Sequence, residues 1–482
     1  MTNAPTNVRP EVAARAVSAE VTAIDAHARW PILFLLGSAL GWLVISGVLA
    51  LITSIQVHSP AYLADCPWLT FGRAQALRET AFVYGWAANA GLAIALWVLG
   101  RLGGYPLRAL NWAVVGTLFW NVGVAVGLVG IATGDMTSFS LLQLPRYVQP
   151  LLAFAYAAIA IPGVLAWGGR RTEGTYAAQW YGVAALFLFP WLLIGAQAVL
   201  GWFPLRGTAQ AVAAGWYAQG AWTLWLAPLA LAGAYYILPK ITGRVVPTYE
   251  SAPLGFWTLI FAGAWTGGRH LIGGPVPAWV PTMAVVASGL LTFHYLVIAL
   301  NFRPIFGARG TAAKFIRFGL VAYLLTGGLE FLTAFRGIAV QTQFTFLSTA
   351  IEQLGLYGGI SMLLFGAIYY MVPRLTGNAW ASTGLTVGHR VLVMAAVVLL
   401  VVTLAVAGGS QAADLLDPKI GLGDIYGRIR LALLLSSGAE LLLLAANLLL
   451  LVNFCRTACV CRTDTATAPL FQEPGTLEVH VS

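Results

Sequence analysis

The chain has 482 residues, of which 59% are hydrophobic and only 9% charged, and its formal net charge is +9. A soluble domain carries about 25% charged residues, so this composition excludes an ordinary water-soluble protein and indicates that lipid solvates part of the surface. The positive charge lies in short segments between apolar runs, with no basic face and no interleaved aromatic patch. We therefore predict contact with membrane lipid and no nucleic-acid partner.

Twelve apolar runs are long enough to cross a bilayer, which takes about 20 residues of helix. The sequence thus predicts an all-α integral membrane protein. The expected spans are residues 30–54, 79–100, 108–132, 146–168, 178–201, 212–238, 253–273, 279–300, 315–339, 345–373, 389–410 and 429–453.

Basic residues orient these spans. With the N-terminus inside, seventeen of the 26 Lys and Arg residues are cytoplasmic and eight are periplasmic, while Arg269 falls within a span. This bias predicts a bacterial inner membrane protein with both termini in the cytoplasm. Residues 30–454 are expected to form the membrane domain, between a cytoplasmic N-terminal tail at 1–29 and a cytoplasmic C-terminal tail at 455–482. Residues 1–29 and those from 463 onward are polar and are expected to be flexible. The first span is too long for a cleavable signal peptide.

One stretch recurs along the chain. Residues 235–244 read YYILPKITGR and residues 369–378 read YYMVPRLTGN, each closing a span on the cytoplasmic side, four spans apart. A weaker copy, LWVLGRLGG at 96–104, closes a span four earlier, and the ordinary needs of a helix ending suffice to explain it. The repeat divides the twelve spans into three groups of four.

This layout resembles subunit I of the heme-copper oxidases, most closely the cbb3-type cytochrome c oxidase, over residues 30–454. The segments that carry the resemblance are Phe71-Gly72-Arg73, Trp216-Tyr217, YYILPK at 235–240, Gly268-Arg269-His270-Leu271, Pro373-Arg374-Leu375 and Arg428-Ile429-Arg430. The resemblance implies a low-spin heme, a high-spin heme and a copper ion, held by six histidines with a tyrosine beside the copper.

The six ligand positions can be read in this chain by their spacing from those segments. The three heme-ligand positions hold Arg78, Ile351 and Gln353, and the three copper-ligand positions hold Gln219, Arg269 and His270. Gly263 stands at the tyrosine position. Only one of the six is therefore a histidine.

The substitutes do not replace imidazole. Arginine has no available lone pair, isoleucine has no donor atom, and a neutral amide is a poor ligand for iron or copper. Among the other histidines, His27, His389 and His480 are expected outside the apolar core and His58 in the first periplasmic loop. His294 lies roughly 18 Å deeper than His270, too far to share a metal. We therefore assign no catalytic residue and no cofactor from these positions, although the family implies two hemes and one copper.

Charged residues inside the membrane are costly and normally paired or functional. We expect Arg269 to pair with Glu352, and Gln219 and Gln353 to join them in a hydrogen-bonded network that fills the former cofactor space. Glu330 and Glu440 fit either a helix–helix hydrogen bond or a proton path. Glu79 is expected to form a local ion pair with Arg78, with a role in binding a substrate as the alternative.

The four cysteines do not form a disulfide framework. Cys66 stands alone on the periplasmic side, and the other three follow the last span in the reducing cytoplasm. The spacing of Cys455, Cys459 and Cys461 is a weak signal for a metal or a lipid anchor.

Three functions remain compatible with the sequence. The first is a catalytically degenerate subunit I homologue with a structural role in a membrane respiratory complex, next to a cytochrome c-bearing partner. The second is an active terminal oxidase that couples cytochrome c oxidation and oxygen reduction to proton transport. The third is a membrane carrier or channel that reuses the emptied cavities.

Overall fold

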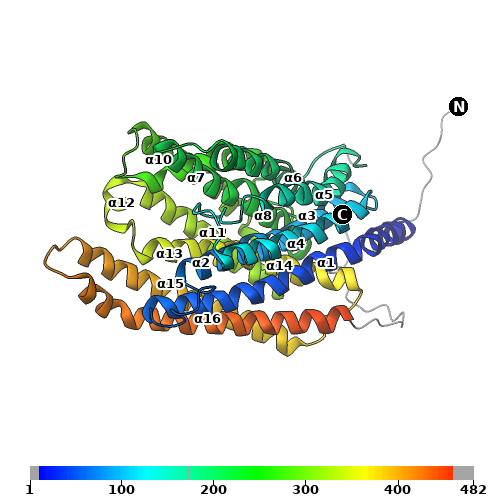
Figure 1. The fold of residues 1–482 in the computed structure, drawn as a ribbon. Helices are drawn as coiled ribbons and strands as arrows, with labels where there is room; N and C mark the ends of the chain where they lie inside the picture. The colour runs from blue at the N-terminus through cyan, green and yellow to red at the C-terminus, as the bar shows by residue number, and fades with distance from the viewer. Residues whose placement is uncertain (1–9, 172, 460–482) are drawn as a thin grey trace.

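The computed structural model describes residues 10–171 and 173–459, and this part of the chain is helical with no β-strand. Figure 1 shows the helices running roughly parallel as one bundle. The α-helices are α1 (Pro10–His58), α2 (Phe71–Thr80), α3 (Ala88–Gly103), α4 (Leu110–Thr133), α5 (Val148–Gly168), α6 (Ala177–Ala196), α7 (Thr208–Gly220), α8 (Ala227–Thr242), α9 (Ala252–Ala262), α10 (Trp279–Asn301), α11 (Thr311–Ala334), α12 (Arg336–Thr342), α13 (Phe346–Gln353), α14 (Met362–Thr376), α15 (Thr383–Leu415) and α16 (Leu422–Cys459). The π-helical segments are η1 (Ala81–Ala87), η2 (Gln197–Trp202), η3 (Ala221–Leu226) and η7 (Leu354–Ser361), and the 3₁₀ segments are η4 (Tyr249–Ser251), η5 (Gly263–Leu271) and η6 (Arg303–Gly307).

Eleven helices within the described residues are long and apolar enough to cross a membrane. The seventh expected span, at 253–273, corresponds to α9 followed by η5, so its second half is wound as a tighter 3₁₀-helix. Together they make twelve crossings. An even number agrees with Figure 1, where the beginning of α1 and the end of α16 lie at the same end of the bundle. The predicted fold class is confirmed.

Three spans form the interior of the bundle. They are α2–η1–α3, α7–η3–α8 and α13–η7–α14, and their most apolar windows are 94%, 94% and 89% buried. The most apolar windows of the other long helices are between 39% and 56% buried, because one face of each helix is exposed to lipid. The interior spans are the second in each of the three groups of four that the sequence repeat defines.

The three interior spans also share an internal layout. Each consists of an α-helix, a π-helical segment and a second α-helix that ends in the repeated sequence. Those endings meet in space: the ring centroid of Trp97 lies 5.2 Å from that of Tyr236 and 6.1 Å from that of Tyr370. The 96–104 segment is therefore a full structural copy of the repeat, which its sequence alone did not establish.

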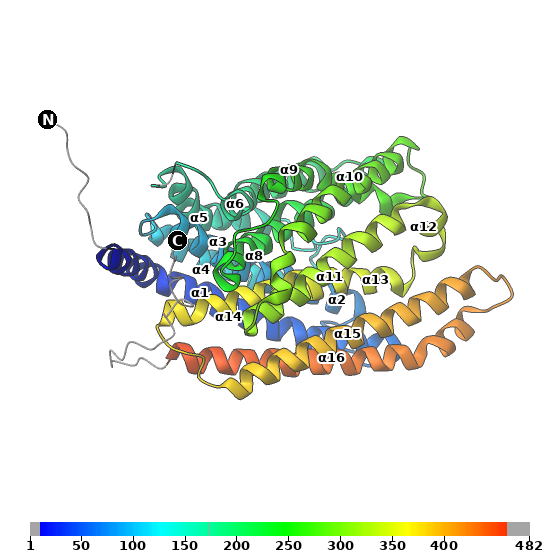
Figure 2. The same cartoon turned by 180° about the vertical axis from the view of Figure 1, so that it is seen from behind.

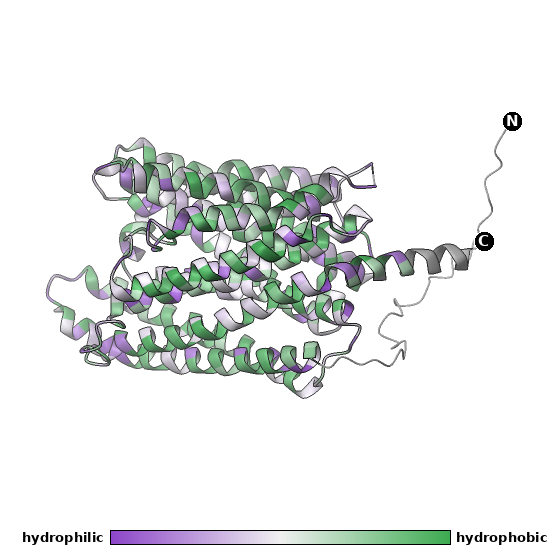
Figure 3. Cartoon of the chain, turned by 45° about the vertical axis from the view of Figure 1, so that its right-hand side comes forward, coloured by the Kyte–Doolittle hydropathy of each residue, from purple (hydrophilic) through white to green (hydrophobic). Residues whose placement is uncertain are grey.

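The outer helices complete the bundle. Helices α15 and α16 pack along each other at one edge, and α9 and α10 lie at the opposite edge (Figures 1 and 2). Figure 3 shows hydrophobic residues along the helices, as expected for surfaces that face acyl chains. The long α15–α16 hairpin ends in a turn held by an ion pair between Arg428 and Asp414.

Helix α1 begins at Pro10, about twenty residues before the expected first span and inside the segment expected to be a flexible tail. Residues in this stretch pack against the bundle, because Ile24, Asp25 and Ala28 are buried. The carboxylate of Asp25 accepts hydrogen bonds from Trp97 Nε1 at 2.9 Å and from the Arg101 guanidinium. At the other end of the chain, α16 continues to Cys459. Cys455 and Cys459 are exposed free thiols, and Cys461 and His480 lie outside the described residues.

Candidate functional site

The six positions that the family would use for metal ligands surround one cavity of about 620 Å³. This convergence was predicted only through the resemblance, and the fold now places all six side chains on a common wall. They come from α2, α7, η5 and α13: Arg78, Gln219, Arg269, His270, Ile351 and Gln353.

The cavity is confined to one half of the bundle. Its lining includes residues of the π-helical segments η1, η3 and η7, and none from α3, α8 or α14, which continue these spans toward the other end. Exposed Ser140, in the connection after α4, and half-buried Thr342, at the end of α12, lie at its opening. On the predicted topology this opening is on the periplasmic side.

Arg269 pairs with Glu330 across the cavity wall. Its Nη2 donates to Glu330 Oε1 of α11 at 2.7 Å, and both side chains are largely buried. The expected pair with Glu352 is therefore wrong. The pair with Glu352 was expected from the ligand positions alone, and the fold instead places the Glu330 carboxylate of α11 beside the Arg269 guanidinium. A hydrogen bond between helices was one of two roles expected for Glu330, and the observed contact is this ion pair between α11 and η5.

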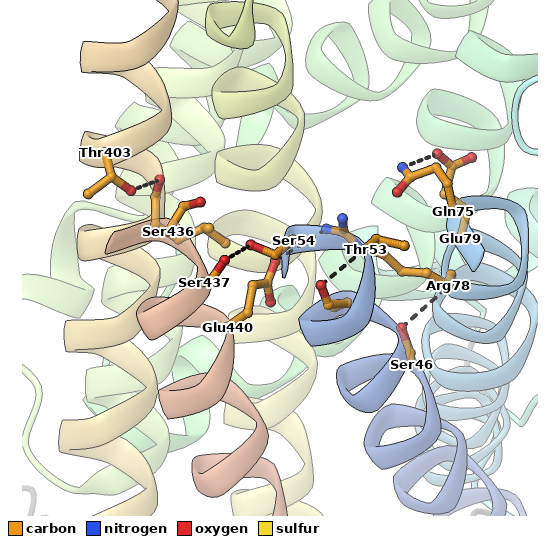
Figure 4. A network of polar contacts seen from close by, with 12 residues as sticks. Ser46, Thr53, Ser54, Gln75, Arg78, Glu79, Thr403, Ser436, Ser437 and Glu440 are labelled. Atoms are coloured by element: carbon orange, nitrogen blue, oxygen red, sulfur yellow. Dashed lines mark hydrogen bonds and ion pairs between the residues drawn. The ribbon is translucent and has the colours of Figure 1, made fainter. Parts of the chain in front are cut away.

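Arg78 pairs with Glu440 of α16, with 3.4 Å between Nη2 and Oε1. Figure 4 shows these two side chains beside Ser46 of α1, whose hydroxyl donates to the Arg78 carbonyl oxygen. The expected pair between Arg78 and Glu79 does not form, because adjacent residues on a helix do not face each other. Glu79 instead accepts hydrogen bonds from Gln75 on its own helix and from Gln143.

Glu352 lines the cavity without a partner. No hydrogen bond or ion pair joins its carboxylate to another described residue, and its side chain is exposed to the cavity space. It lies seven residues below the helix cap at Thr345, a depth of about 10 Å, so the exposure comes from the cavity rather than from the protein surface.

Three buried donors on the lining also lack partners: the amide nitrogens of Gln219 and Asn447 and the indole nitrogen of Trp222. The expected closed network of polar side chains is therefore incomplete. Sequence analysis singled out neither Asn447, which accepts from the Tyr357 hydroxyl at 2.7 Å, nor the Gln143 that holds Glu79. A pattern within one helix could not reveal these contacts between distant spans.

Glycines bring backbones together where the family would place copper. A Cβ on Gly267 of η5 would lie 2.2 Å from the carbonyl oxygen of Gly215 on α7, so the two backbones touch. A Cβ on Gly263 would lie 2.5 Å from the Thr223 side chain of η3. The tyrosine position therefore has room for glycine and not for a phenol.

The residues present do not fit two hemes and a copper ion. Two ligand positions hold guanidinium groups committed to carboxylates, a third holds an aliphatic side chain, and His270 is the one imidazole among the six. Within the described residues, no three His, Cys, Asp or Glu side chains are grouped as a metal site would require.

The remaining histidines have other partners. His294 is buried as expected, and its ring nitrogens lie 2.8 Å from the Gly255 carbonyl oxygen and 2.9 Å from the Tyr323 hydroxyl. His389 was expected outside the apolar core and is fully buried, with Nδ1 2.9 Å from the Tyr369 hydroxyl. The reason is that α15 begins at Thr383, which carries His389 into the bundle. His58 ends α1, where its Nε2 lies 3.0 Å from the Ser437 hydroxyl.

Residues 31–414 match the protein family described as cytochrome c and quinol oxidase polypeptide I. The chain belongs to this family. It is 24% identical over 383 residues to the Cbb3-type cytochrome c oxidase subunit CcoN1 of Stutzerimonas stutzeri, in an alignment that covers 77% of this chain and 81% of that protein. It is 25% identical over 404 residues to the cytochrome c oxidase subunit 1 homolog of Agrobacterium tumefaciens, covering 77% and 71%. The predicted membership in the heme-copper oxidase subunit I family, with cbb3-type relatives, is confirmed.

The fold agrees with that of a solved member of this class of enzyme. A cryo-EM structure of a heme-copper terminal oxidase dimer superposes with a TM-score of 0.64 at 15% sequence identity, covering 92% of this chain and 85% of the other. At that identity the match establishes the arrangement of the spans alone.

Proposed function

We propose that this chain is a catalytically silent member of the oxidase subunit I family that serves as a structural subunit of a respiratory assembly. It would lie in a bacterial inner membrane with both termini in the cytoplasm. The observation that carries the proposal is the presence of Arg78 and Arg269 at ligand positions, each tied to a carboxylate. A guanidinium cannot ligate iron or copper, and its own charge would repel a metal cation.

The two ion pairs link helices that metal cofactors would otherwise link. A metal ligated from several helices ties those helices together. Here the Arg78–Glu440 pair ties α2 to α16, and the Arg269–Glu330 pair ties η5 to α11. These contacts support a scaffold that holds its shape without metal.

A structural role needs partners, and the names of the relatives support their existence. The curated relatives are named as subunits of cytochrome c oxidases. We expect this chain to bind other respiratory subunits, among them one that carries a cytochrome c domain.

The test is to purify a tagged chain from its native membranes, alone and with whatever remains bound under mild detergent. We expect the isolated chain to show no Soret absorption and no stoichiometric copper, and the assembly to contain a cytochrome-bearing subunit. Stoichiometric heme and copper in the isolated chain would overturn the proposal in favour of an active terminal oxidase.

A membrane carrier is the second candidate, and the open cavity with the unpaired Glu352 favours it. Against transport, the cavity lining includes no residue of α3, α8 or α14, so the observed cavity occupies one side of the bundle. Uptake of labelled solutes into proteoliposomes would distinguish a carrier from a scaffold.

A further inference from the structure

The charges on the cavity wall do not balance. Arg78 and Arg269 each form an ion pair with one glutamate, Glu440 and Glu330, and this leaves Glu79 and Glu352 without an ion pair of their own. Glu79 is oriented by amide donors that carry no charge. An unpaired carboxylate inside a protein is costly unless water or a cation accompanies it. The wall therefore has an excess of negative charge directed at an open volume.

The remainder of the wall suits an organic group better than a bare metal ion. Phe82, Trp222 and Tyr357 line the cavity, and aromatic faces attract ammonium groups. The volume of about 620 Å³ lies within the range of small-molecule sites and far exceeds that of one ion. The described residues also lack a group of three His, Cys, Asp or Glu ligands for a metal.

Two buried amides give independent support for a ligand. Gln219 and Asn447 are only 7% and 1% exposed, both line the cavity, and the amide nitrogen of each has no hydrogen-bond partner. Unsatisfied buried donors are rare in folded proteins and commonly mark a site for a ligand or an ordered water. Both nitrogens are enclosed as they stand, so a rotation of the side chain would be needed for either to donate to a hydroxyl or carbonyl oxygen of a cationic ligand.

We propose that this cavity is a binding site for a small organic cation, an ammonium compound bearing an oxygen acceptor, held by Glu352 and Glu79 against aromatic walls. The site uses the space around the former ligand positions but none of the family's metal chemistry. It does not depend on the structural role proposed above, because a cation could bind whether or not a partner subunit is attached.

The experiment is calorimetric titration of the full chain in lipid nanodiscs with choline as the probe. Its uncharged isostere 3,3-dimethylbutan-1-ol and sodium ion serve as comparison ligands. We expect choline to bind and both comparison ligands to fail. Because a charge-assisted contact is lost, E352Q and E79Q should each weaken choline binding about tenfold. The matched control is E250Q, since Glu250 on η4 is exposed and does not line the cavity.

Each outcome bears on one of the two proposals. Equal binding of the uncharged isostere, no choline binding by the wild-type chain, or unchanged binding by E352Q would each overturn the inference. E352Q removes a charge without a partner, so its thermal stability should at least equal that of the wild type, which guards against misfolding as an explanation. Heme absorption in the same sample would overturn the structural proposal, whereas absent choline binding without heme would overturn only the cation site.

Discussion

Arg269 and Glu330 form a buried ion pair between η5 and α11, 2.7 Å from nitrogen to oxygen. Breaking a buried pair from one side costs about 3–5 kcal/mol, because the remaining charge stays unpaired. We therefore expect R269E to lower the thermal unfolding temperature and the yield of folded protein, and R269E/E330R to recover much of both. Fluorescence-detected unfolding of the purified variants measures this. Recovery in R269E/E352R instead would contradict the assignment.

The Arg78–Glu440 pair should be weaker than the Arg269–Glu330 pair, since its atoms lie 3.4 Å apart. A double-mutant cycle with R78M and E440Q isolates the interaction from the other effects of each change. We expect the double variant to be less destabilised than the sum of the singles, with a coupling energy below that of a matching cycle with R269M and E330Q. A larger coupling for Arg78 would mean that its side chain reaches Glu440 more closely than the structure indicates.

The Gly267–Gly215 contact should tolerate no added methyl group. In G267A the new Cβ would approach the Gly215 carbonyl oxygen to 2.2 Å, so α7 and η5 must separate. Overpacking of this kind costs about 1–3 kcal/mol and should lower the unfolding temperature. Gly328 on α11 is the control, because nothing lies within 4 Å of its Cβ position and G328A should be neutral or slightly stabilising. Equal effects of the two changes would argue against the close approach.

The spans themselves were predictable because hydropathy and length decide what crosses a bilayer. The repeat at 235–244 and 369–378 indicated the grouping of the spans in fours, but not that the second span of each group is interior. What sequence could not supply was rotation and distance between spans. Arg269 lies in the 3₁₀ segment η5 and pairs with Glu330 of α11, and no pattern at 253–273 signals either the winding or the partner.

The true start of α1 was missed for the same kind of reason. Residues before Trp30 look polar when read alone, and Asp25 becomes a core residue only through contacts with Trp97 and Arg101, more than seventy positions away. Of the candidate site, the set of cavity residues followed from the family resemblance. The partners of Glu79, Glu330 and Glu440 required the folded chain.

The Asp25–Arg101 pair gives a test of this part of α1. Both side chains are largely buried, so D25A should lower the unfolding temperature markedly through the uncompensated guanidinium. Glu20, five residues earlier on the same helix, pairs with Arg171 at the exposed surface, and E20A should cause no resolvable change. If D25A matched E20A, this stretch would contribute little to the bundle.

The three interior spans change winding at the boundary of the cavity, at η1, η3 and η7. On one side of that boundary, the closely packed second halves of these spans, α3, α8 and α14, stabilise the fold. On the other side, side chains that line the cavity have fewer packing partners, so exchanging them costs less stability. Side chains in the half that holds the cavity can therefore change while the half formed by α3, α8 and α14 keeps the arrangement of the spans.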